Sequence, residues 1–153
     1  MQICKLQKNN LSQAIDLVQK VFDEFEAPEY SKMGIETFRH FIGYDNLSGM
    51  MQSKEMTFYG CFLESTLIGV GALRGNQHIS LLFVQKEYHR QGVARRLFRN
   101  MLLQCQNSNP DQKAMTVNAS PYGVIAYEHL GFQKISEEQL RDGIRFTPMI
   151  YKY

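Results

Sequence analysis

The residues whose types and spacing best suit chemistry lie in one stretch, residues 79–97. It begins with an apolar run that ends at Val84 and predicts a strand, passes through a polar turn, and continues as a helix that opens with Gly92, Val93 and Ala94. The first backbone N–H groups of a helix lack partners, and the helix dipole favours negative charge beside them. Because Gly92 has no Cβ, the main chain can approach a ligand closely there. The stretch therefore predicts a loop that binds an anion such as a phosphate group.

The turn before this helix resembles the coenzyme A-binding motif of the GNAT-type N-acetyltransferase superfamily, written Q/R-x-x-G-x-G/A. The matching residues are His89, Arg90, Gln91, Gly92, Val93 and Ala94. His89 departs from the pattern, since glutamine or arginine is usual at that position. In the family the loop wraps the pyrophosphate of the coenzyme mainly with main-chain N–H groups, so the resemblance implies that residues 89–94 bind acetyl-CoA. The alternative is an ordinary helix start made of small residues.

A second group of residues resembles the other signature of the family. Asn118 ends a predicted strand, and residues 126–132 read Ala-Tyr-Glu-His-Leu-Gly-Phe, where the family has a Y-E-K-L-G-F-like helix end. The resemblance implies that Asn118 hydrogen-bonds the pantetheine arm and that Tyr127 protonates the departing thiolate. A phenol with a pKa of about 10 is only slightly weaker as an acid than a thiol with a pKa of about 8.5. The alternative packs Tyr127 against the sheet and leaves Asn118 to satisfy a turn.

An amine acceptor must lose a proton before or during its attack on a thioester. A lysine-like amine with a pKa of about 10.4 is neutral in roughly one molecule in 2,500 at pH 7, a penalty of about 4.6 kcal/mol. His78 is the predicted general base, because it falls where the histone-acetylating branch of the family carries a basic Glu, and an imidazole pKa of about 6.5 suits the task. The alternative is a strand-end histidine that is solvated or bonded to a neighbouring carbonyl.

The strand that begins at His78 is also expected to present main-chain groups to the acetyl donor. Two-residue alternation places Ile79, Leu81 and Phe83 on one face of this strand and His78, Ser80 and Leu82 on the other. The resemblance implies that the strand end separates from its neighbour, so that main-chain groups near Phe83 and Val84 bind the acetyl carbonyl and the pantetheine amides. Backbone donors there would stabilise the oxyanion of a tetrahedral intermediate.

Acidic residues gather around the predicted end of the first helix. They are Asp23, Glu24, Glu26 and Glu29, with Tyr30 beside them. In related proteins the first two helices border the acceptor groove, so an acidic rim at this place would attract a cationic amine. The alternative is a solvated helix end with no part in binding.

The rest of the chain predicts the elements that must position these residues. Helices are predicted from Leu11 to the residues before Pro28, over Met33–Ile42, from Gly92 to about Cys105, and over Pro121–Leu130. Strands are predicted over Gln2–Leu6, Met56–Leu63, Leu67–Arg74, His78–Val84, Ala114–Val117, Phe132–Ile135 and Ile144–Tyr151. The segment Gly43–Gly49 is rich in turn formers and is predicted to be a loop. Gly69 and Gly71, inside a strand, indicate a bulge or a close backbone approach.

This order of elements predicts an α+β fold with a mixed, mostly antiparallel, central sheet of about seven strands flanked by about four helices. It is similar to the element order of the GNAT fold over essentially the whole chain. With 153 residues the chain is long enough to bury a core of its own. Residues 1–153 are therefore predicted to form a single N-acetyltransferase domain.

Composition narrows the class of protein further. The formal net charge of +2 is too small to predict binding to nucleic acid or to an anionic membrane. The three cysteines are widely spaced, which predicts no disulfide framework and favours the reducing cytoplasm. No signal peptide and no run of membrane-spanning length is predicted. His40 and His129 lack metal-ligand spacing to other His, Cys or Asp residues, so no metal is expected.

The sequence thus predicts an acetyl-CoA-dependent N-acetyltransferase in which a primary amine, on a small molecule or a protein, attacks the thioester directly in a ternary complex. The predicted catalytic residues are Tyr127 and His78. The alternative is a non-catalytic acyl-CoA-binding regulatory module with the same fold. A nucleotide-phosphate site is disfavoured because no Gly-Lys-Ser/Thr follows the loop. Pro148 marks the last strand as an edge or a bulged strand, and such an edge could support a homodimer.

Overall fold

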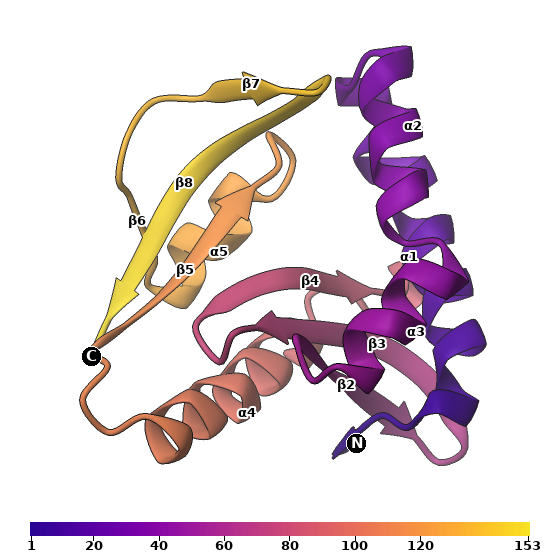
Figure 1. The fold of residues 1–153 in the computed structure, drawn as a ribbon, viewed down its shortest axis with the longest axis vertical. Coiled ribbons are helices and arrows are strands. Elements are labelled where there is room, and N and C mark those ends of the chain that lie inside the picture. The colour runs from indigo at the N-terminus through magenta and orange to yellow at the C-terminus, as the bar shows by residue number, and fades with distance from the viewer.

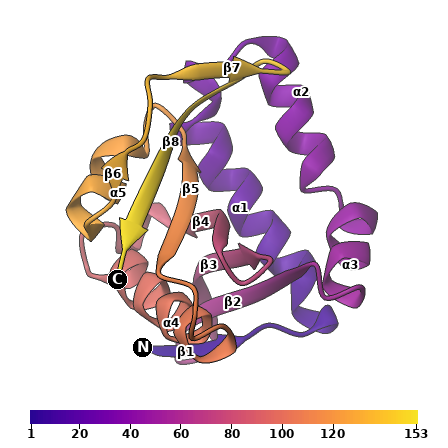
Figure 2. The same ribbon diagram turned by 60° about the vertical axis from the view of Figure 1, so that its left-hand side comes forward.

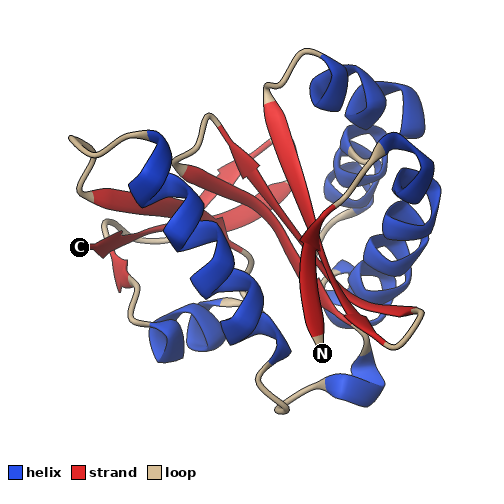
Figure 3. Ribbon diagram, turned by 90° about the horizontal axis from the view of Figure 1, so that it is seen from below, coloured by secondary structure: helices blue, strands red, loops and turns tan.

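The computed structural model describes the whole chain, Met1 to Tyr153, as a mixed sheet between two groups of helices (Figures 1 and 3). The strands are β1 (Gln2–Lys5), β2 (Met56–Leu63), β3 (Thr66–Arg74), β4 (His78–Val84), β5 (Ala114–Ala119), β6 (Gln133–Lys134), β7 (Gln139–Arg141) and β8 (Ile144–Lys152). They lie in the order β1-β2-β3-β4-β5-β8-β6, and β7 pairs with β8. Only β4 and β5 pair in parallel. The predicted fold class is confirmed, with eight strands where about seven were expected.

The prediction that Pro148 makes the last strand an edge or a bulged strand was wrong. Strand β8 pairs with β5 on one side and with β6 and β7 on the other, without a register shift at Pro148. The carbonyl of Pro148 accepts the N–H of Ile135 (2.9 Å), so the N–H that proline lacks would face the side where β6 has already ended at Lys134.

Five α-helices cover the two faces of the sheet. Helices α1 (Leu11–Phe25), α2 (Lys32–Phe41) and α3 (Tyr44–Gln52) pack on one face, and α4 (Val93–Ser108) and α5 (Val124–Leu130) pack on the other. Each face buries its own apolar cluster, so the central strands carry apolar side chains in both directions. We call these clusters the α1-side core and the α4-side core. None of the helices has the length and apolar character needed to cross a membrane.

Helix α3 occupies the segment for which the turn-forming residues predicted a loop. Leu47 is buried in the α1-side core, and Met50 and Met51, three and four residues later, pack against the same core. These residues form an apolar stripe at helical spacing. Asp45 lies in the first turn, where the helix dipole favours negative charge. The loop prediction was wrong because burial of this stripe outweighs the low helix propensity of its Asp, Asn and Ser residues.

Strand β7 was not predicted either, and with β8 it forms a hairpin that reaches helix α2 (Figures 1 and 2). The main chains of Gly34 in α2 and Gly143 in the hairpin turn touch, and a Cβ on either glycine would collide with the other residue. The hydroxyl of Thr37 donates to the carbonyl of Asp142 (2.7 Å). The hairpin therefore joins the α1–α3 side of the molecule to the β5–β8 side.

Strand β4 contains a bulge that reverses its faces. The register between β3 and β4 shifts so that Ser80 has no partner across the ladder. Ile79 packs into the α4-side core, whereas Leu81 packs into the α1-side core. The predicted alternation was therefore wrong, because it ran through the bulge without a break. His78, which points away from Ile79, lies on the α1 side of the sheet together with Leu81.

The glycines of β3 allow α4 to lie close to the sheet, as their position in the strand predicted. A Cβ on Gly69 would lie 2.8 Å from a side-chain carbon of Val93, and a Cβ on Gly71 would lie 3.0 Å from the end of Met101. Both contacts are tighter than packed side chains normally make. The close packing fixes the N-terminal turn of α4, and with it the predicted coenzyme loop, against the central strands.

Candidate active site

The candidate site is built around a gap between β4 and β5. The two parallel strands pair only where His78 lies beside Thr116 and Ile79 beside Val117. Beyond this junction they separate, and Figure 1 shows them leaving it in different directions. The separation of the strand ends, which the family resemblance implied, is thus present. It leaves the end of β4 at Val84 and the end of β5 at Ala119 on opposite sides of the gap.

The loop His89–Ala94, on the β4 side, offers a run of free main-chain donors. No backbone N–H group from Arg90 to Arg95 donates to an acceptor in the protein; the first bond of α4 runs from the N–H of Arg96 to the carbonyl of Gly92 (3.0 Å). Arg90 and Gly92 have left-handed backbones (φ 62° and 82°) and are exposed. Such donors beside the positive end of a helix fit the chemistry of a diphosphate.

His89, which departs from the family pattern, binds the protein itself. Its Nε2 donates to the carbonyl of Val84 (2.7 Å), which fixes the start of the loop to the end of β4. Because a carbonyl only accepts, this nitrogen carries a proton. The His89 ring also packs at 5.0 Å, centroid to centroid, against Phe25 at the end of α1. The side chain therefore has a positioning role. The backbone N–H of His89 donates to the carbonyl of Lys86 (3.2 Å), so the free main-chain donors of the loop begin at Arg90.

Val84 and Phe83 differ in the direction of their main-chain groups. The Val84 carbonyl accepts His89 from the side away from β3, whereas the N–H of the next residue, Gln85, donates back to the carbonyl of Ile68 (2.9 Å). Main-chain groups alternate in direction along a strand. The groups of Phe83 accordingly face β3, and those of Val84 face the gap. The Phe83 side chain is buried in the α1-side core, 5.9 Å from the ring of Phe38.

Tyr127 and Asn118 lie on the other side of the gap. Tyr127 is partly buried in α5 and packs edge-on against Phe132 at 5.4 Å. Burial, together with the charge of Glu26, raises the pKa of the Tyr127 hydroxyl well above the usual value. Asn118 is exposed near the end of β5, opposite Pro148. A bond from Arg95 to the carbonyl of His129 (3.0 Å) ties α5 to the start of α4.

His78 lies at the closed end of the gap, apart from these groups. Its Nδ1 is 2.8 Å from the hydroxyl of Thr116. Five residues of strand separate it from Phe83, which corresponds to roughly 16 Å at about 3.3 Å per residue. Burial, and to a lesser degree the charge of Arg74, lowers its pKa. The structure thus brings Tyr127, Asn118, Val84 and the loop His89–Ala94 to the open end and leaves His78 at the junction.

The acidic group at the end of α1 divides into two parts. Asp23 pairs with Arg39 (3.3 Å) and Glu24 with Lys86 (3.5 Å), both on the surface. Glu26, by contrast, is partly buried and lies near the side chain of Ser120, on the other side of the gap. Burial raises the pKa of Glu26 to about 7, and the nearby Ser120 hydroxyl opposes this rise. Glu26 is the residue whose importance the sequence did not reveal, since nothing local separates it from its acidic neighbours.

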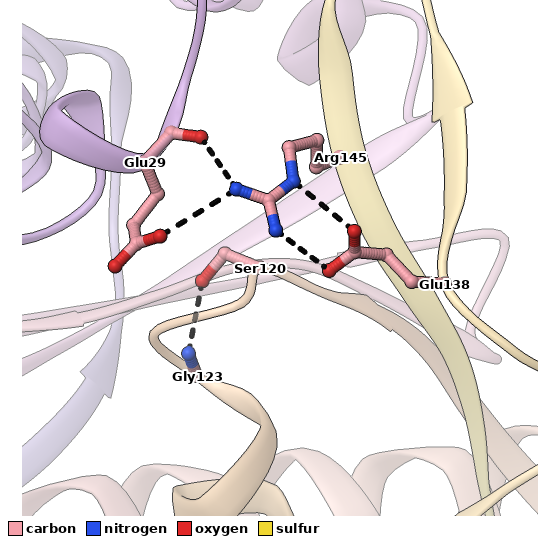
Figure 4. A network of polar contacts seen from close by, with 5 residues as sticks. All are labelled: Glu29, Ser120, Gly123, Glu138 and Arg145. Atoms are coloured by element: carbon pink, nitrogen blue, oxygen red, sulfur yellow. Dashed lines mark hydrogen bonds and ion pairs between the residues drawn. The ribbon is translucent and has the colours of Figure 1, made fainter.

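A network centred on Arg145 links the turn after α1 to β8 (Figure 4). The guanidinium binds both carboxylate oxygens of Glu138 (3.1 and 3.3 Å) and also donates to the carbonyl of Glu29 (3.1 Å). Figure 4 shows Ser120 beside this network, with its hydroxyl accepting the N–H of Gly123 (3.0 Å). The network holds the turn after α1 against β8, so the position of Glu26 is fixed from both sides.

No group of three or more His, Cys, Asp or Glu side chains is placed to hold a metal ion.

The family model described as Acetyltransferase (GNAT) domain matches residues 26–153. A comparison with curated protein sequences gives no match.

Solved structures share this fold at low sequence identity. A GCN5-related N-acetyltransferase from Rhodopseudomonas palustris superposes with a TM-score of 0.85 at 15% identity, over 99% of this chain and 95% of that one. PaiA N-acetyltransferase from Thermoplasma acidophilum, in complex with coenzyme A, superposes with a TM-score of 0.79 at 23% identity, over 99% of this chain and 98% of that one. An aminoglycoside 6'-N-acetyltransferase complexed with coenzyme A superposes with a TM-score of 0.72 at 13% identity, over 99% of this chain and 97% of that one. These likenesses establish the fold of the chain.

Proposed function

The chain belongs to the GNAT acetyltransferase family, and from this premise we propose that it transfers the acetyl group of acetyl-CoA to a primary amine. The observation that carries the proposal is the run of free N–H groups from Arg90 to Arg95 at one side of the β4–β5 gap. Tyr127, on α5, lies on the other side of the gap. A diphosphate held by the loop would direct the rest of the coenzyme into the gap between the strands.

In the proposed mechanism the amine attacks the thioester carbonyl directly. The N–H of Val84, and by alternation that of Leu82, face the gap and are the donors we assign to the oxyanion, in place of Phe83. We assign Asn118, which is exposed near the end of β5, to hydrogen-bond the pantetheine arm. Tyr127 gives its proton to the departing sulfur as the carbon–sulfur bond breaks.

The departure of His89 from the family pattern leaves room for the alternative, a regulatory module that binds acyl-CoA without turnover. The bond from His89 to the Val84 carbonyl accounts for the histidine as a structural residue. His89 therefore gives no support to a non-catalytic role. The free thiols of Cys4, Cys61 and Cys105 support our further proposal that the protein works in the reducing cytoplasm.

A thiol-release assay with acetyl-CoA and a panel of amines tests the proposal. The panel contains a polyamine, an aminoglycoside, free amino acids and a peptide with a lysine and a free N-terminus. We expect acetyl-CoA to bind in calorimetry and at least one primary amine to release coenzyme A with formation of an N-acetyl product. Binding without release for every amine would favour the regulatory module, and absence of binding would refute both functions.

A further inference from the structure

Glu26 lies between the two halves of the candidate site. Its N–H donates to the carbonyl of Phe22 (2.9 Å), so it is the residue that ends α1. The preceding Phe25 contacts His89 on the coenzyme loop and Tyr122 after β5, with ring centroids at 5.0 and 5.2 Å. The end of α1 therefore spans the opening between β4 and β5, and Glu26 sits where an acceptor would enter.

Glu26 is the acidic side chain of this region without a cationic partner. Asp23, Glu24, Glu29 and Glu138 each form an ion pair, with Arg39, Lys86 or Arg145. Glu26 has none, and the polar side chain near it is that of Ser120, which is buried (9% exposed). A carboxylate without a cation, at the mouth of a site proposed to take amines, is suited to an ammonium group.

The surroundings of Glu26 favour its neutral form. Burial raises its pKa to about 7, and the negative end of the α1 dipole also disfavours a carboxylate there. Tyrosines from three segments face it: Tyr30, Tyr122 and Tyr127, each with a pKa raised in part by Glu26. The other charged groups around these tyrosines are Glu24, Glu29, Arg90, Glu138 and Arg145. A base of this strength both takes a proton from an ammonium group and releases it near neutral pH.

We propose that Glu26 is the general base of the acceptor site, accepting a proton from the ammonium group of a primary-amine substrate. This inference rests on the proposed function. The neutral nitrogen then forms a bond to the thioester carbon, and the carbon–sulfur bond breaks. One amine proton reaches solvent through Glu26. The thiolate takes the proton of Tyr127, and the second proton lost from nitrogen restores the phenol.

The order of these steps follows from the coupling between Glu26 and Tyr127. Burial and, to a lesser degree, the charge of Glu26 raise the pKa of Tyr127, so the phenol keeps its proton until the amine arrives. Once Glu26 has taken the amine proton its charge is gone, and Tyr127 becomes a stronger acid at the stage when the thiolate needs a proton. The two groups are on α1 and α5, on opposite sides of the acceptor entrance.

Glu26 fits the role better than His78 does. His78 is bonded to Thr116 at the closed end of the gap, and burial and Arg74 lower its pKa, which weakens it as a base. The variant His78→Ala therefore provides a second comparison with Glu26→Gln. Glu24, two residues from Glu26 and paired with Lys86 on the surface, provides the matched control.

The test compares pH profiles of kcat/KM for the wild type and for Glu26→Gln, Glu24→Gln and His78→Ala with the best amine of the panel. We expect Glu26→Gln to lower kcat/KM roughly 100-fold at pH 7 and to abolish the ascending limb of the pH profile near pH 7. The loss should shrink toward pH 9.5, where the amine deprotonates by itself. Glu24→Gln should keep the wild-type limb. Loss of the limb in His78→Ala but not in Glu26→Gln would assign the base to His78 and overturn the proposal. Acetyl-CoA affinity should be unchanged in all of them.

An independent readout is the carboxyl-carbon NMR titration of Glu26, assigned by its absence in Glu26→Gln. A midpoint near 7 supports the proposal, and a midpoint near the ordinary value overturns it. Turnover with an unchanged ascending limb in Glu26→Gln overturns the role of Glu26 alone. Absence of turnover in the wild type with bound acetyl-CoA overturns the proposed function, and the base role falls with it.

Discussion

Replacing Glu26 by glutamine should stabilise the folded protein at pH 8 and leave its stability unchanged at pH 4. Below pH 4.5 the carboxyl is protonated in both the folded and the unfolded chain, so it contributes nothing to the difference. Between pH 4.5 and about 7 the unfolded chain loses this proton while the folded chain keeps it, so the free energy of unfolding falls as the pH rises. Above pH 7 the full penalty is present, and glutamine removes it.

The size of the effect follows from the burial of Glu26. A pKa raised from 4.5 to about 7 corresponds to about 3.4 kcal/mol of lost stability at high pH. Glu26 keeps partial contact with solvent, which screens its charge, so we expect about 2 kcal/mol. In a domain of this size that gain corresponds to a rise in melting temperature of roughly 4–8 °C.

Urea unfolding of the wild type and of Glu26→Gln at pH 4, 6 and 8 measures this difference. Glu24→Gln is the control, because its exposed pair with Lys86 should contribute no more than about 1 kcal/mol and should not produce a rising gain with pH. If Glu26→Gln raises the free energy of unfolding equally at pH 4 and pH 8, or lowers it at pH 8, the desolvated environment that we assign to Glu26 is wrong. The expected gain would also show that Glu26 is retained at a cost in stability, as is typical of functional carboxylates.

The other predictions concern the parts of the site that hold and activate the coenzyme. Tyr127→Phe should lower kcat by about 100-fold, because the leaving thiolate loses its proton donor, with the calorimetric Kd for acetyl-CoA unchanged; equal kcat values would remove Tyr127 from the mechanism. Gly92→Ala should raise that Kd about tenfold, since a side chain in the left-handed conformation costs about 1–2 kcal/mol; an unaltered Kd would argue against the loop geometry. Gly34→Ala should lower the melting temperature, because its Cβ meets Gly143, whereas Gly49→Ala, which meets nothing, should raise it or leave it unchanged.

The parts of the site that depend on one continuous segment could be predicted from the sequence. A strand followed by a polar turn and Gly-Val-Ala specifies a helix start with free N–H groups, and the left-handed Gly92 fits that reading. The helix around Tyr127 ends at Gly131, which is left-handed (φ 107°), as a glycine after the last turn predicts. In both cases the structural requirement and the residues that meet it are neighbours in the chain.

The features that the sequence missed depend on contacts between distant segments. The bulge at Ser80 exists only in relation to the register of β3, so alternation along β4 alone could not reveal it. The helix at Tyr44–Gln52 forms because its apolar stripe meets α1 and β2, not because its residues prefer a helix. His89 departs from the family pattern, yet its imidazole reaches the carbonyl at the end of β4.

Glu26 and Glu24 show how the fold gives two identical side chains different surroundings. The two glutamates are two residues apart on the same helix end and have the same intrinsic acidity. A separation of two residues on a helix directs side chains to different sides, so Glu24 faces solvent and Lys86 while Glu26 faces Ser120 at the end of β5. Because β5 diverges from β4, Ser120 and Tyr127 lie within reach of α1 across the gap. The divergence of two strands thus provides space for the coenzyme and also places a desolvated carboxylate at the entrance for an amine.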